Sequence, residues 1–276
     1  MLKPEDLFDL SGFEHKALFD DLEYVWDALK RIKPYIGEVI KPNVTQVRKK
    51  GGMLARTYVL YEGKVLAEGF ELKPGDATNG TFVVIREGKE LSGATVLYAG
   101  AVLFDSNISI GNGTVVEPGA LIKGPAIIGA NTEIRQGAYI RGNVIVGDGC
   151  VVGHTTEVKD SIMLNGAKAG HFAYIGDSIL GRVNLGAGTK LANLKIKVSG
   201  PTVRVNISGK WYDTGLRKFG AILGDGVETG CNAVLNPGAI LGKGTLVYAN
   251  ASLRGYYPPR SIVKLRQGQR VYKGGE

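Results

Sequence analysis

The sequence contains few cysteines and histidines and no long apolar run. Its 276 residues include 2 cysteines, Cys150 and Cys231, and 3 histidines. Two cysteines are too few for a disulfide framework, so both thiols are expected to be reduced. No apolar run reaches the roughly 18 to 20 residues that a membrane span requires, and the opening residues, MLKPEDLFD, are too acidic for a secretory signal. We therefore expect a cytoplasmic protein that does not enter a membrane.

The charge balance is basic, but no nucleic-acid signature accompanies it. A formal net charge of +8 arises from 34 Lys and Arg against 26 Asp and Glu. The basic residues are scattered along the chain and are not interleaved with aromatic residues, as they are in many nucleic-acid-binding segments. This distribution argues against nucleic acid as a partner and favours small anionic ligands.

Glycine is abundant, at 41 residues, without the three-residue period of collagen. Such an excess favours many tight turns, because glycine adopts positive φ at little steric cost. A period of six emerges from Ile110 onward, since every sixth residue there is a β-branched aliphatic. The members of this series are Ile110, Val116, Ile122, Ile128, Ile134, Ile140, Val146, Val152 and Val158.

Each six-residue unit is interpreted as one short strand followed by one corner. Gly-Asn-Gly and Gly-Asp-Gly segments recur between the aliphatic positions and supply turn material. Three such strands close a triangular coil of about 18 residues, in which each inward aliphatic stacks on its counterpart one coil away. The repeat therefore predicts a mainly β fold, a parallel β-helix whose core is the aliphatic stack.

The series loses its phase after Val158 and then returns. The second series is Leu223, Thr229, Leu235, Leu241, Val247 and Leu253, with one polar member. Between the two lies the segment from Leu194 to Arg217, in which alternating β-forming residues surround a Ser-Gly pair. That pattern predicts a β-hairpin, at residues 194–217, inserted at a corner of the helix.

Residues 1–95 are expected to form an α/β extension ahead of the repeat. Apolar residues at helical spacing within His15 to Ile32 predict one amphipathic helix that ends before Pro34. The stretch from Thr57 to Ile85 alternates and turns at Glu-Gly and Asn-Gly, which predicts β-hairpins. No glycine-rich nucleotide-binding loop occurs there.

The β-helix is expected to occupy residues 96–258 and a basic tail residues 259–276. We expect the segment from Tyr256 to Pro259 to end the repeat. The tail contains Arg260, Lys264, Arg266, Arg270 and Lys273.

Two segments of the repeat have sequences that are more distinctive than the six-residue period itself. AGHFAYIGD at Ala169–Asp177 and NLGAGT at Asn184–Thr189 resemble the acetyltransferase domain of bacterial N-acetylglucosamine-1-phosphate uridyltransferase. The resemblance extends over approximately residues 100 to 270. It implies a left-handed parallel β-helix of hexapeptide repeats and a homotrimer.

The resemblance also implies three catalytic residues. His171 matches the general base, a role that suits imidazole because an ammonium must lose a proton before its nitrogen attacks a thioester. Glu157 matches a glutamate that orients or polarises this histidine. Asn193 matches an asparagine near the reacting groups, where an amide orients the amine or stabilises the oxyanion.

Five further residues match positions that bind the sugar phosphate in that family. Arg135, Lys159 and Lys218 supply the positive charges that a phosphate dianion requires, as a bidentate fork or a compact ammonium. Tyr174 and Asn184 complete the set. The resemblance thus implies an amino-sugar phosphate, such as glucosamine 1-phosphate, as the acceptor, in nucleotide-sugar biosynthesis.

Acetyl-CoA is the implied co-substrate, and no catalytic metal is implied. The matching positions are Ala187, Cys231, Ala249 and Arg266, small side chains along the prism and one cation for the phosphates. Two positions depart from the family pattern. Leu194 stands where the family has tyrosine, and Cys231 replaces a serine that helps at the thioester, although a thiol is the poorer donor.

Three alternatives remain open from the sequence. A zinc enzyme of the γ-carbonic anhydrase type needs three histidines on one metal, whereas this chain has only His15, His154 and His171, the first of them outside the repeat. A non-catalytic hexapeptide scaffold would account for Leu194 and Cys231. A sugar-phosphate nucleotidyltransferase is disfavoured, because the residues before the repeat are too few for its nucleotide-binding domain.

Overall fold

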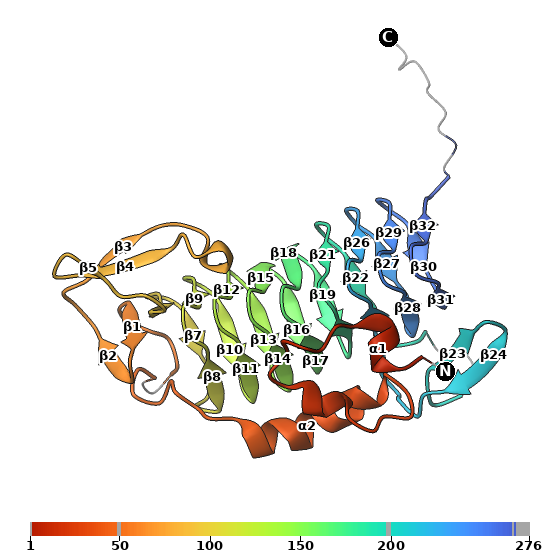
Figure 1. Ribbon diagram of the computed structural model, residues 1–276, viewed down its shortest axis with the longest axis horizontal. Helices are drawn as coiled ribbons and strands as arrows, with labels where there is room; N and C mark the ends of the chain where they lie inside the picture. The colour runs from red at the N-terminus through yellow and green to blue at the C-terminus, as the bar shows by residue number, and fades with distance from the viewer. Residues whose placement is uncertain (1, 49–50, 197–199, 267, 269–276) are drawn as a thin grey trace, which may run out of the picture.

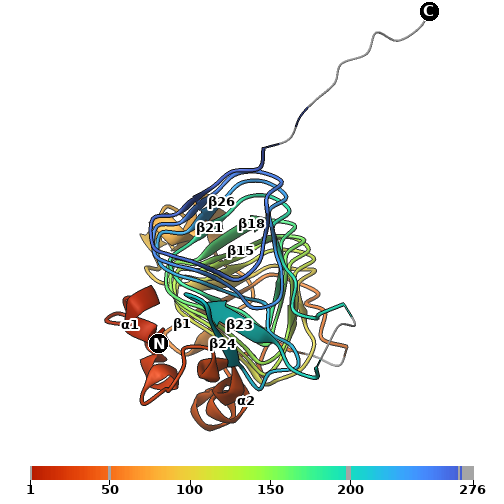
Figure 2. The ribbon, with the colours of Figure 1, turned by 90° about the vertical axis from the view of Figure 1, so that its right-hand side faces the viewer.

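Three parallel sheets wrap the chain into a triangular prism. The computed structural model describes residues 2–48, 51–196, 200–266 and 268. Successive strands go in turn to three faces, and each strand pairs with the strand one coil before it and one coil after it. Figures 1 and 2 show the stacked coils from the side and along their axis. The predicted left-handed parallel β-helix with an N-terminal α/β extension is confirmed.

The faces are named here in the order in which the chain visits them. The first face contains β6 (Thr95–Leu97), β9 (Val115–Val116), β12 (Glu133–Ile134), β15 (Val151–His154), β18 (Lys168–His171), β21 (Asn184–Leu185), β26 (Glu228–Thr229), β29 (Leu246–Val247) and β32 (Ile262–Val263). The second face contains β7 (Val102–Leu103), β10 (Leu121–Lys123), β13 (Tyr139–Arg141), β16 (Glu157–Lys159), β19 (Tyr174–Gly176), β22 (Lys190–Leu191), β27 (Val234–Leu235) and β30 (Ser252–Leu253). The third face contains β8 (Ile108–Ile110), β11 (Ala126–Ile128), β14 (Val144–Val146), β17 (Ser161–Met163), β20 (Ile179–Leu180), β25 (Ala221–Leu223), β28 (Ala239–Leu241) and β31 (Tyr256–Tyr257). The first corner joins the first face to the second, and the second corner joins the second face to the third.

The aliphatic series of the sequence forms the core of the prism. Every member from Ile110 to Val158 is buried in one continuous cluster. Because the strands pair in register, each inward aliphatic side chain lies next to an aliphatic side chain of the neighbouring coil, as Ile122 does next to Ile140. The polar member Thr229 is also accommodated, because its hydroxyl lies 2.8 Å from that of Thr189. The predicted stack is therefore confirmed.

The lost phase after Val158 reflects a shortened corner and not a break in the helix. Met163 pairs with Val146, so this coil is one residue shorter than the coils before it. Serine side chains compensate at the shortened second corner: the Ser161 hydroxyl donates to the Lys159 carbonyl at 2.7 Å and accepts from the Ser178 N–H at 3.0 Å. A side-chain hydroxyl thus replaces a missing backbone group.

The N-terminal extension covers the outer side of the third face (Figures 1 and 2). It contains α1 (Pro4–Leu7), the 3-10 turn η1 (Lys16–Phe19) and α2 (Asp27–Val39). Outward isoleucines of the third face, such as Ile145 and Ile162, share a second hydrophobic cluster with Trp26 and Ile36. In the described part of the chain, no helix combines the length and apolar character needed to cross a membrane.

The predicted helix from His15 to Ile32 is wrong in position. The helix α2 begins at Asp27 and continues through Pro34 to Val39. Proline removes one helical hydrogen bond, but the helix keeps its buried face because Ile32 and Ile36 pack on either side of it. The first half of the predicted helix instead consists of the 3-10 turn η1 and irregular structure, in which Leu18 and Val25 are buried.

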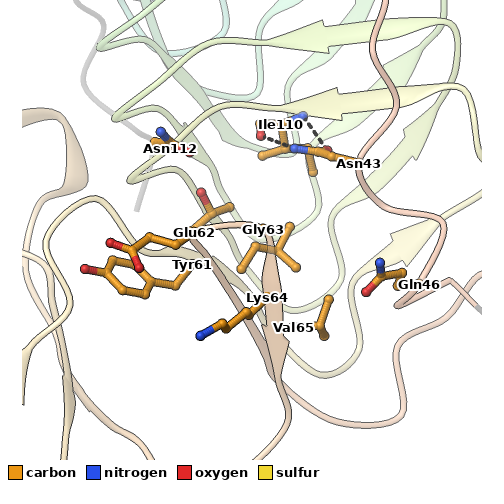
Figure 3. Close-up of a pocket in the computed structure, with 11 residues that line it drawn as sticks. Asn43, Gln46, Tyr61, Glu62, Gly63, Lys64, Val65, Ile110 and Asn112 are labelled. Carbon is orange, nitrogen blue, oxygen red and sulfur yellow. Dashed lines mark hydrogen bonds between the residues drawn. The ribbon is translucent and has the colours of Figure 1, made fainter.

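The N-terminal end of the prism is capped. Gly52 accepts from the Leu103 N–H, and the Asn43 side chain holds both backbone groups of Ile110, donating to its carbonyl at 2.7 Å and accepting from its N–H at 3.0 Å. Figure 3 shows this contact at a polar cavity of about 210 Å³ that is also lined by Tyr61 and Lys64. These contacts occupy backbone groups of β7 and β8, the first strands of their sheets, that would otherwise be open to pairing with another chain.

Short antiparallel strands complete this end. The strand β1 (Tyr58–Tyr61) pairs with β6 and with β2 (Lys64–Leu66), and the chain turns at Glu62 and Gly63 as predicted. A small sheet of β3 (Glu71–Lys73), β4 (Val83–Arg86) and β5 (Lys89–Glu90), with the turn η2 (Ala77–Asn79), follows. The small sheet shares a third cluster with residues of the first face, including Val96 and Val115.

The insertion between β22 and β25 is a hairpin, as predicted. Its strands β23 (Arg204–Ile207) and β24 (Lys210–Asp213) pair antiparallel around Ser208 and Gly209. The repeat ends one strand later than expected, because β32 pairs with β29 beyond Pro259. The tail residues Arg270 and Lys273 lie outside the described residues.

The core stack can be tested with a matched pair of isoleucines. Ile140 is fully buried, whereas Ile196 is 88% exposed. Ile140→Ala should lower the free energy of unfolding by about 2–5 kcal/mol, because it removes buried methyl groups and leaves a cavity. Ile196→Ala should leave it within about 0.5 kcal/mol of the parent. Urea unfolding followed by circular dichroism measures both, and equal effects would contradict the assigned core.

Candidate functional site

The predicted site residues are divided between two faces and the corners beside them. Glu157 and Tyr174 project outward from the second face, where their strands pair in register. Asn184 lies exposed on the first face, between Lys168 and Glu228 of the neighbouring strands. His171 ends β18 at the first corner. Within one chain, therefore, Glu157 and Tyr174 point outward from the second face, whereas Asn184 points outward from the first face.

His171 lies at an exposed position on the first corner. It pairs with His154 of the preceding coil, and its carbonyl accepts from the Gly188 N–H at 3.0 Å. The local packing requires glycine below it, because a Cβ at Gly153 would collide with the Gly170 backbone. The imidazole is thus held on a tightly stacked turn while remaining open to solvent.

Three of the predicted cofactor residues continue the row that His171 begins. Along the first corner the Gly188 N–H bonds to the His171 carbonyl, and the Asn232 N–H bonds to the Ala187 carbonyl at 2.8 Å. The Asn250 N–H bonds to the Cys231 carbonyl at 2.9 Å in the same way. Equivalent places on successive coils are therefore occupied by His171, Ala187, Cys231 and Ala249, a set called the corner row below. Arg266 is exposed beyond β32.

Glu157 pairs with an arginine that the sequence did not single out. Its Oε1 lies 2.6 Å from Nη1 of Arg141 on the neighbouring strand. The hydrogen bond to Glu157 raises the pKa of Arg141 above its ordinary value. Both residues lie on the second face one coil apart, so the coil length could have pointed to the pair.

A charged cluster occupies the second corner. Nζ of Lys159 lies 2.9 Å from Oδ2 of Asp177 and 2.5 Å from Oδ2 of Asp160, and the Lys159 side chain is 11% exposed. The Asn193 amide donates to the same Oδ2 of Asp177 at 2.5 Å. Asp177 therefore ties together two predicted site residues, although the sequence reading gave it no role.

The titration behaviour of the cluster follows from its pairing. Burial opposes the charge of Lys159, but its hydrogen bonds to Asp160 and Asp177 raise its pKa above the ordinary value. Burial likewise disfavours the Asp160 carboxylate, yet Lys159, Asn143 and the charge of Lys218 lower its pKa. The predicted phosphate ligand Lys218 comes directly before Phe219, whose N–H donates to the Asn193 carbonyl at 2.9 Å, so its backbone lies beside the cluster.

Tyr174 lies across the coil beside Asn193. A Cβ added at Gly176 would lie 2.7 Å from the Tyr174 hydroxyl and 2.8 Å from Nδ2 of Asn193. Glycine at this position therefore leaves room for both side chains. Burial raises the pKa of Tyr174, so its hydroxyl remains a hydrogen-bond donor at neutral pH.

Arg135 lies apart from this cluster, at the first corner. Its Nη2 lies 2.6 Å from Oε2 of Glu133, whose Oε1 accepts from the Ala77 N–H at 2.9 Å. The ion pair links the corner to the small N-terminal sheet. Its guanidinium is one third exposed and keeps donors for another anion.

The histidines do not meet at one point. The Nδ1 atom of His15 lies 3.1 Å from the Tyr35 hydroxyl in the N-terminal extension, and burial lowers the pKa of this histidine. Over residues 2–48, 51–196, 200–266 and 268, no three His, Cys, Asp or Glu side chains are grouped as metal ligands would be.

Comparison with known proteins shows what the β-helix resembles. Residues 122–249 match the family model described as the GMPPB C-terminal domain. A bifunctional sugar-1-phosphate nucleotidylyltransferase/acetyltransferase of Sulfurisphaera tokodaii is 41% identical over 101 residues, which cover 36% of this chain and 25% of that protein. The bifunctional protein GlmU of Methanococcus maripaludis (strain C7) is 45% identical over 153 residues, which cover 53% of this chain and 36% of GlmU.

The chain thus spans about a third or less of the length of these relatives. A solved structure of AntD, an N-acyltransferase from Bacillus cereus with dTDP and Coenzyme A, is 16% identical, with 59% of this chain and 84% of that chain covered and a TM-score of 0.23, too low to carry an argument. The sequence matches confirm the predicted resemblance: part of the β-helix is similar to the GMPPB C-terminal domain and to bifunctional GlmU proteins.

The two cysteines differ in accessibility, and this difference can be measured. Cys150 is buried, which raises the pKa of its thiol to about 12, whereas Cys231 is exposed on the corner row. At pH 8 the native protein should react with Ellman's reagent at Cys231, and Cys150 should react only after unfolding in guanidinium, because the thiolate is the nucleophile. Cys231→Ser is the matched control and should abolish the native reaction. Comparable reaction of both thiols in the folded protein would refute this assignment.

Proposed function

We propose that this chain is an acetyl-CoA-dependent N-acetyltransferase that acts on an amino-sugar phosphate, such as glucosamine 1-phosphate, in cytoplasmic nucleotide-sugar biosynthesis. The corner row carries the proposal. It aligns the candidate base His171 with Ala187, Cys231 and Ala249 along the prism axis. A long, flexible thioester lying along small side chains would bring its acyl group to one end of the row, beside His171.

The chemistry assigned to these residues is a simple acyl transfer. His171 takes a proton from the sugar ammonium, and the freed nitrogen attacks the thioester carbonyl carbon. The tetrahedral oxyanion then collapses and the C–S bond breaks, while the attacking nitrogen gives up a further proton to the departing CoA thiolate. The products are the N-acetyl sugar, CoA and protonated His171, which releases its proton to water. The Asn193 amide is positioned at the second corner by Asp177 and serves to orient the amine or the oxyanion.

The phosphate is assigned to cationic residues from two places, Lys218 beside the charged cluster and Arg135 at the first corner. Lys159 already neutralises Asp160 and Asp177, so a phosphate would compete with two carboxylates for it. Lys218 and Arg135 are therefore the stronger phosphate ligands in this proposal, and Lys159 chiefly keeps Asp177 in place. The Tyr174 hydroxyl is available to the sugar.

We further propose a homotrimer in which each site lies between two copies. Asn184 projects from the first face, and Tyr174 and Asn193 lie on or beside the second face. Groups that point outward from different faces of one prism cannot close around one small ligand, but the faces of two neighbouring copies can. Closed cyclic symmetry would give every copy the same contacts.

The base is tested against the histidine at the equivalent place one coil earlier, His154. His171→Ala should lower kcat for acetyl transfer to glucosamine 1-phosphate by roughly 10² to 10⁴, because a general base acts in the transition state. The KM for acetyl-CoA should change little. Release of CoA, followed with a thiol reagent on a Cys231→Ser background, measures the rate.

His154→Ala is the matched control. His154 occupies the equivalent place one coil earlier, and its Nδ1 lies 3.0 Å from the Gln136 carbonyl. Its replacement should leave kcat within about threefold of the parent. A folded His171→Ala protein with unchanged turnover, or equal losses in both variants, would remove the proposed mechanism and favour a non-catalytic scaffold.

The shared site is tested by subunit mixing. Asn184→Ala and Asn193→Ala should each lose activity alone, because each removes one side of the site. Mixed trimers obtained by co-expression with two purification tags should recover up to about a quarter of the parental sites, since one interface in four would combine the two intact sides. Light scattering checks the trimer. A monomer, or mixed trimers without any recovery, would exclude the shared site.

A further inference from the structure

The insertion returns to the prism at the candidate site, and its return is fixed by aromatic packing. It leaves the second corner directly after Asn193 and comes back through Lys218 and Phe219. The Phe219 N–H donates to the Asn193 carbonyl at 2.9 Å, and the next N–H, of Gly220, donates to the Asp177 carbonyl at 2.8 Å. Two backbone bonds therefore tie the end of the insertion to the residues of the charged cluster.

Phe219 is fully buried, and the N-terminal extension provides its cover. The ring centroids of Trp26 and Phe219 are 6.5 Å apart, and Trp26 is itself fully buried. Trp26 also lies 6.3 Å from Tyr212 of β24, and Tyr24 stacks on Trp26 at 4.8 Å. The same tryptophan thus contacts the hairpin and the point where the hairpin rejoins the prism.

The hairpin has one face turned toward this aromatic cluster and one turned away. Val205 is buried and Tyr212 half-buried on the inner face. The other tryptophan of the chain, Trp211, points outward and is 59% exposed, with Arg204 over its ring at 5.4 Å. The inner face of the hairpin therefore anchors it to the aromatic cluster.

We infer that Trp26, Tyr24 and Tyr212 clamp the insertion, and that through Phe219 this clamp holds Asn193 and Lys218 in place for the acceptor. Trp26 is a positioning residue in this assignment, since it contacts the stem of the insertion and not the reacting atoms. The inference rests on the proposed function for its catalytic consequence. Its structural part stands on the packing and the two backbone bonds.

The site needs such a clamp because an inserted hairpin increases the conformational freedom of the backbone at a corner where Asn193 and Lys218 must be held in fixed positions. The corners of other coils are held by the strand on each side, whereas this corner opens into more than twenty residues between Asn193 and Phe219. A long connection closes at an entropic cost and fluctuates unless other contacts order it. The aromatic cluster supplies those contacts at the base of the connection.

Hydrogen exchange of the Phe219 and Gly220 amides tests the clamp without any assay of activity. Trp26→Ala should make both amides exchange about tenfold faster or more, because opening of the stem becomes a local event. The amide of Ile140, in the core stack, should be unaffected. Tyr212→Ala removes the same contact from the hairpin side and keeps the test valid where Trp26→Ala fails to fold. Trp26→Phe should restore most of the protection, and Trp211→Ala should match the parent.

Kinetics test the positioning. In Trp26→Ala or Tyr212→Ala the KM for glucosamine 1-phosphate should rise about tenfold, whereas the KM for acetyl-CoA should stay within about twofold, because the corner row is not attached to the insertion. Trp211→Ala should change neither value.

The possible outcomes test the clamp, its positioning role and the proposed function separately. Parental exchange at Phe219 and Gly220 in both clamp variants would overturn the clamp, as would equal acceleration at Ile140 or in Trp211→Ala. Faster exchange with parental KM values in an active enzyme would overturn the positioning role. A parent protein that transfers no acetyl group to any amino-sugar phosphate would refute the proposed function, and the exchange data alone would then decide the clamp.

Discussion

The register between successive coils is the constraint on which the rest of this structure depends. Because every strand pairs in parallel with the strand one coil away, a residue's face and direction are set by its place in the coil. One inward aliphatic on each face then stacks on its counterpart and excludes water. The same register arranges the outward residues in rows, and the corner row beginning at His171 is one of them.

The fold could be predicted well where the chain obeys this register. The series from Ile110 to Val158 identified the core, and the alternating pattern between Leu194 and Arg217 indicated the inserted hairpin. The N-terminal helix was misplaced because its local signals conflict. Pro34 marks a helix end in isolation, but burial of Ile36 on the third face outweighs one lost hydrogen bond. Tertiary contacts of this kind are invisible to local periodicity.

The candidate site could be predicted as a set of residues but not as an arrangement. Motif resemblance selected His171, Asn193 and Lys159, yet it did not reveal that Asp177 joins the latter two. Nor did it reveal that Arg141 holds Glu157. These partners lie one coil apart in sequence, so their contact depends on the coil length. The coil shortens by a residue after Lys159, which hides the contacts of Asp177 from a fixed step, whereas the pair of Arg141 and Glu157 lies within a regular coil.

The departures from the repeat and the charged cluster coincide, and this coincidence has a physical basis. The second corner is shortened after Lys159 and again after Gly176, and in the following coil it opens into the inserted hairpin. Asp160 and Asp177 adopt positive φ in the shortened turns, and serine hydroxyls replace the missing backbone partners. A perfectly regular helix would present the same small turn at every coil and could not gather a lysine, two carboxylates and an amide at one point. Sequences that specify one fold consistently tend to break their local rules at functional sites. Under the proposed function, the irregular corner is therefore where selectivity for an acceptor would be built, while the regular first corner would give an extended cofactor a straight row of small side chains.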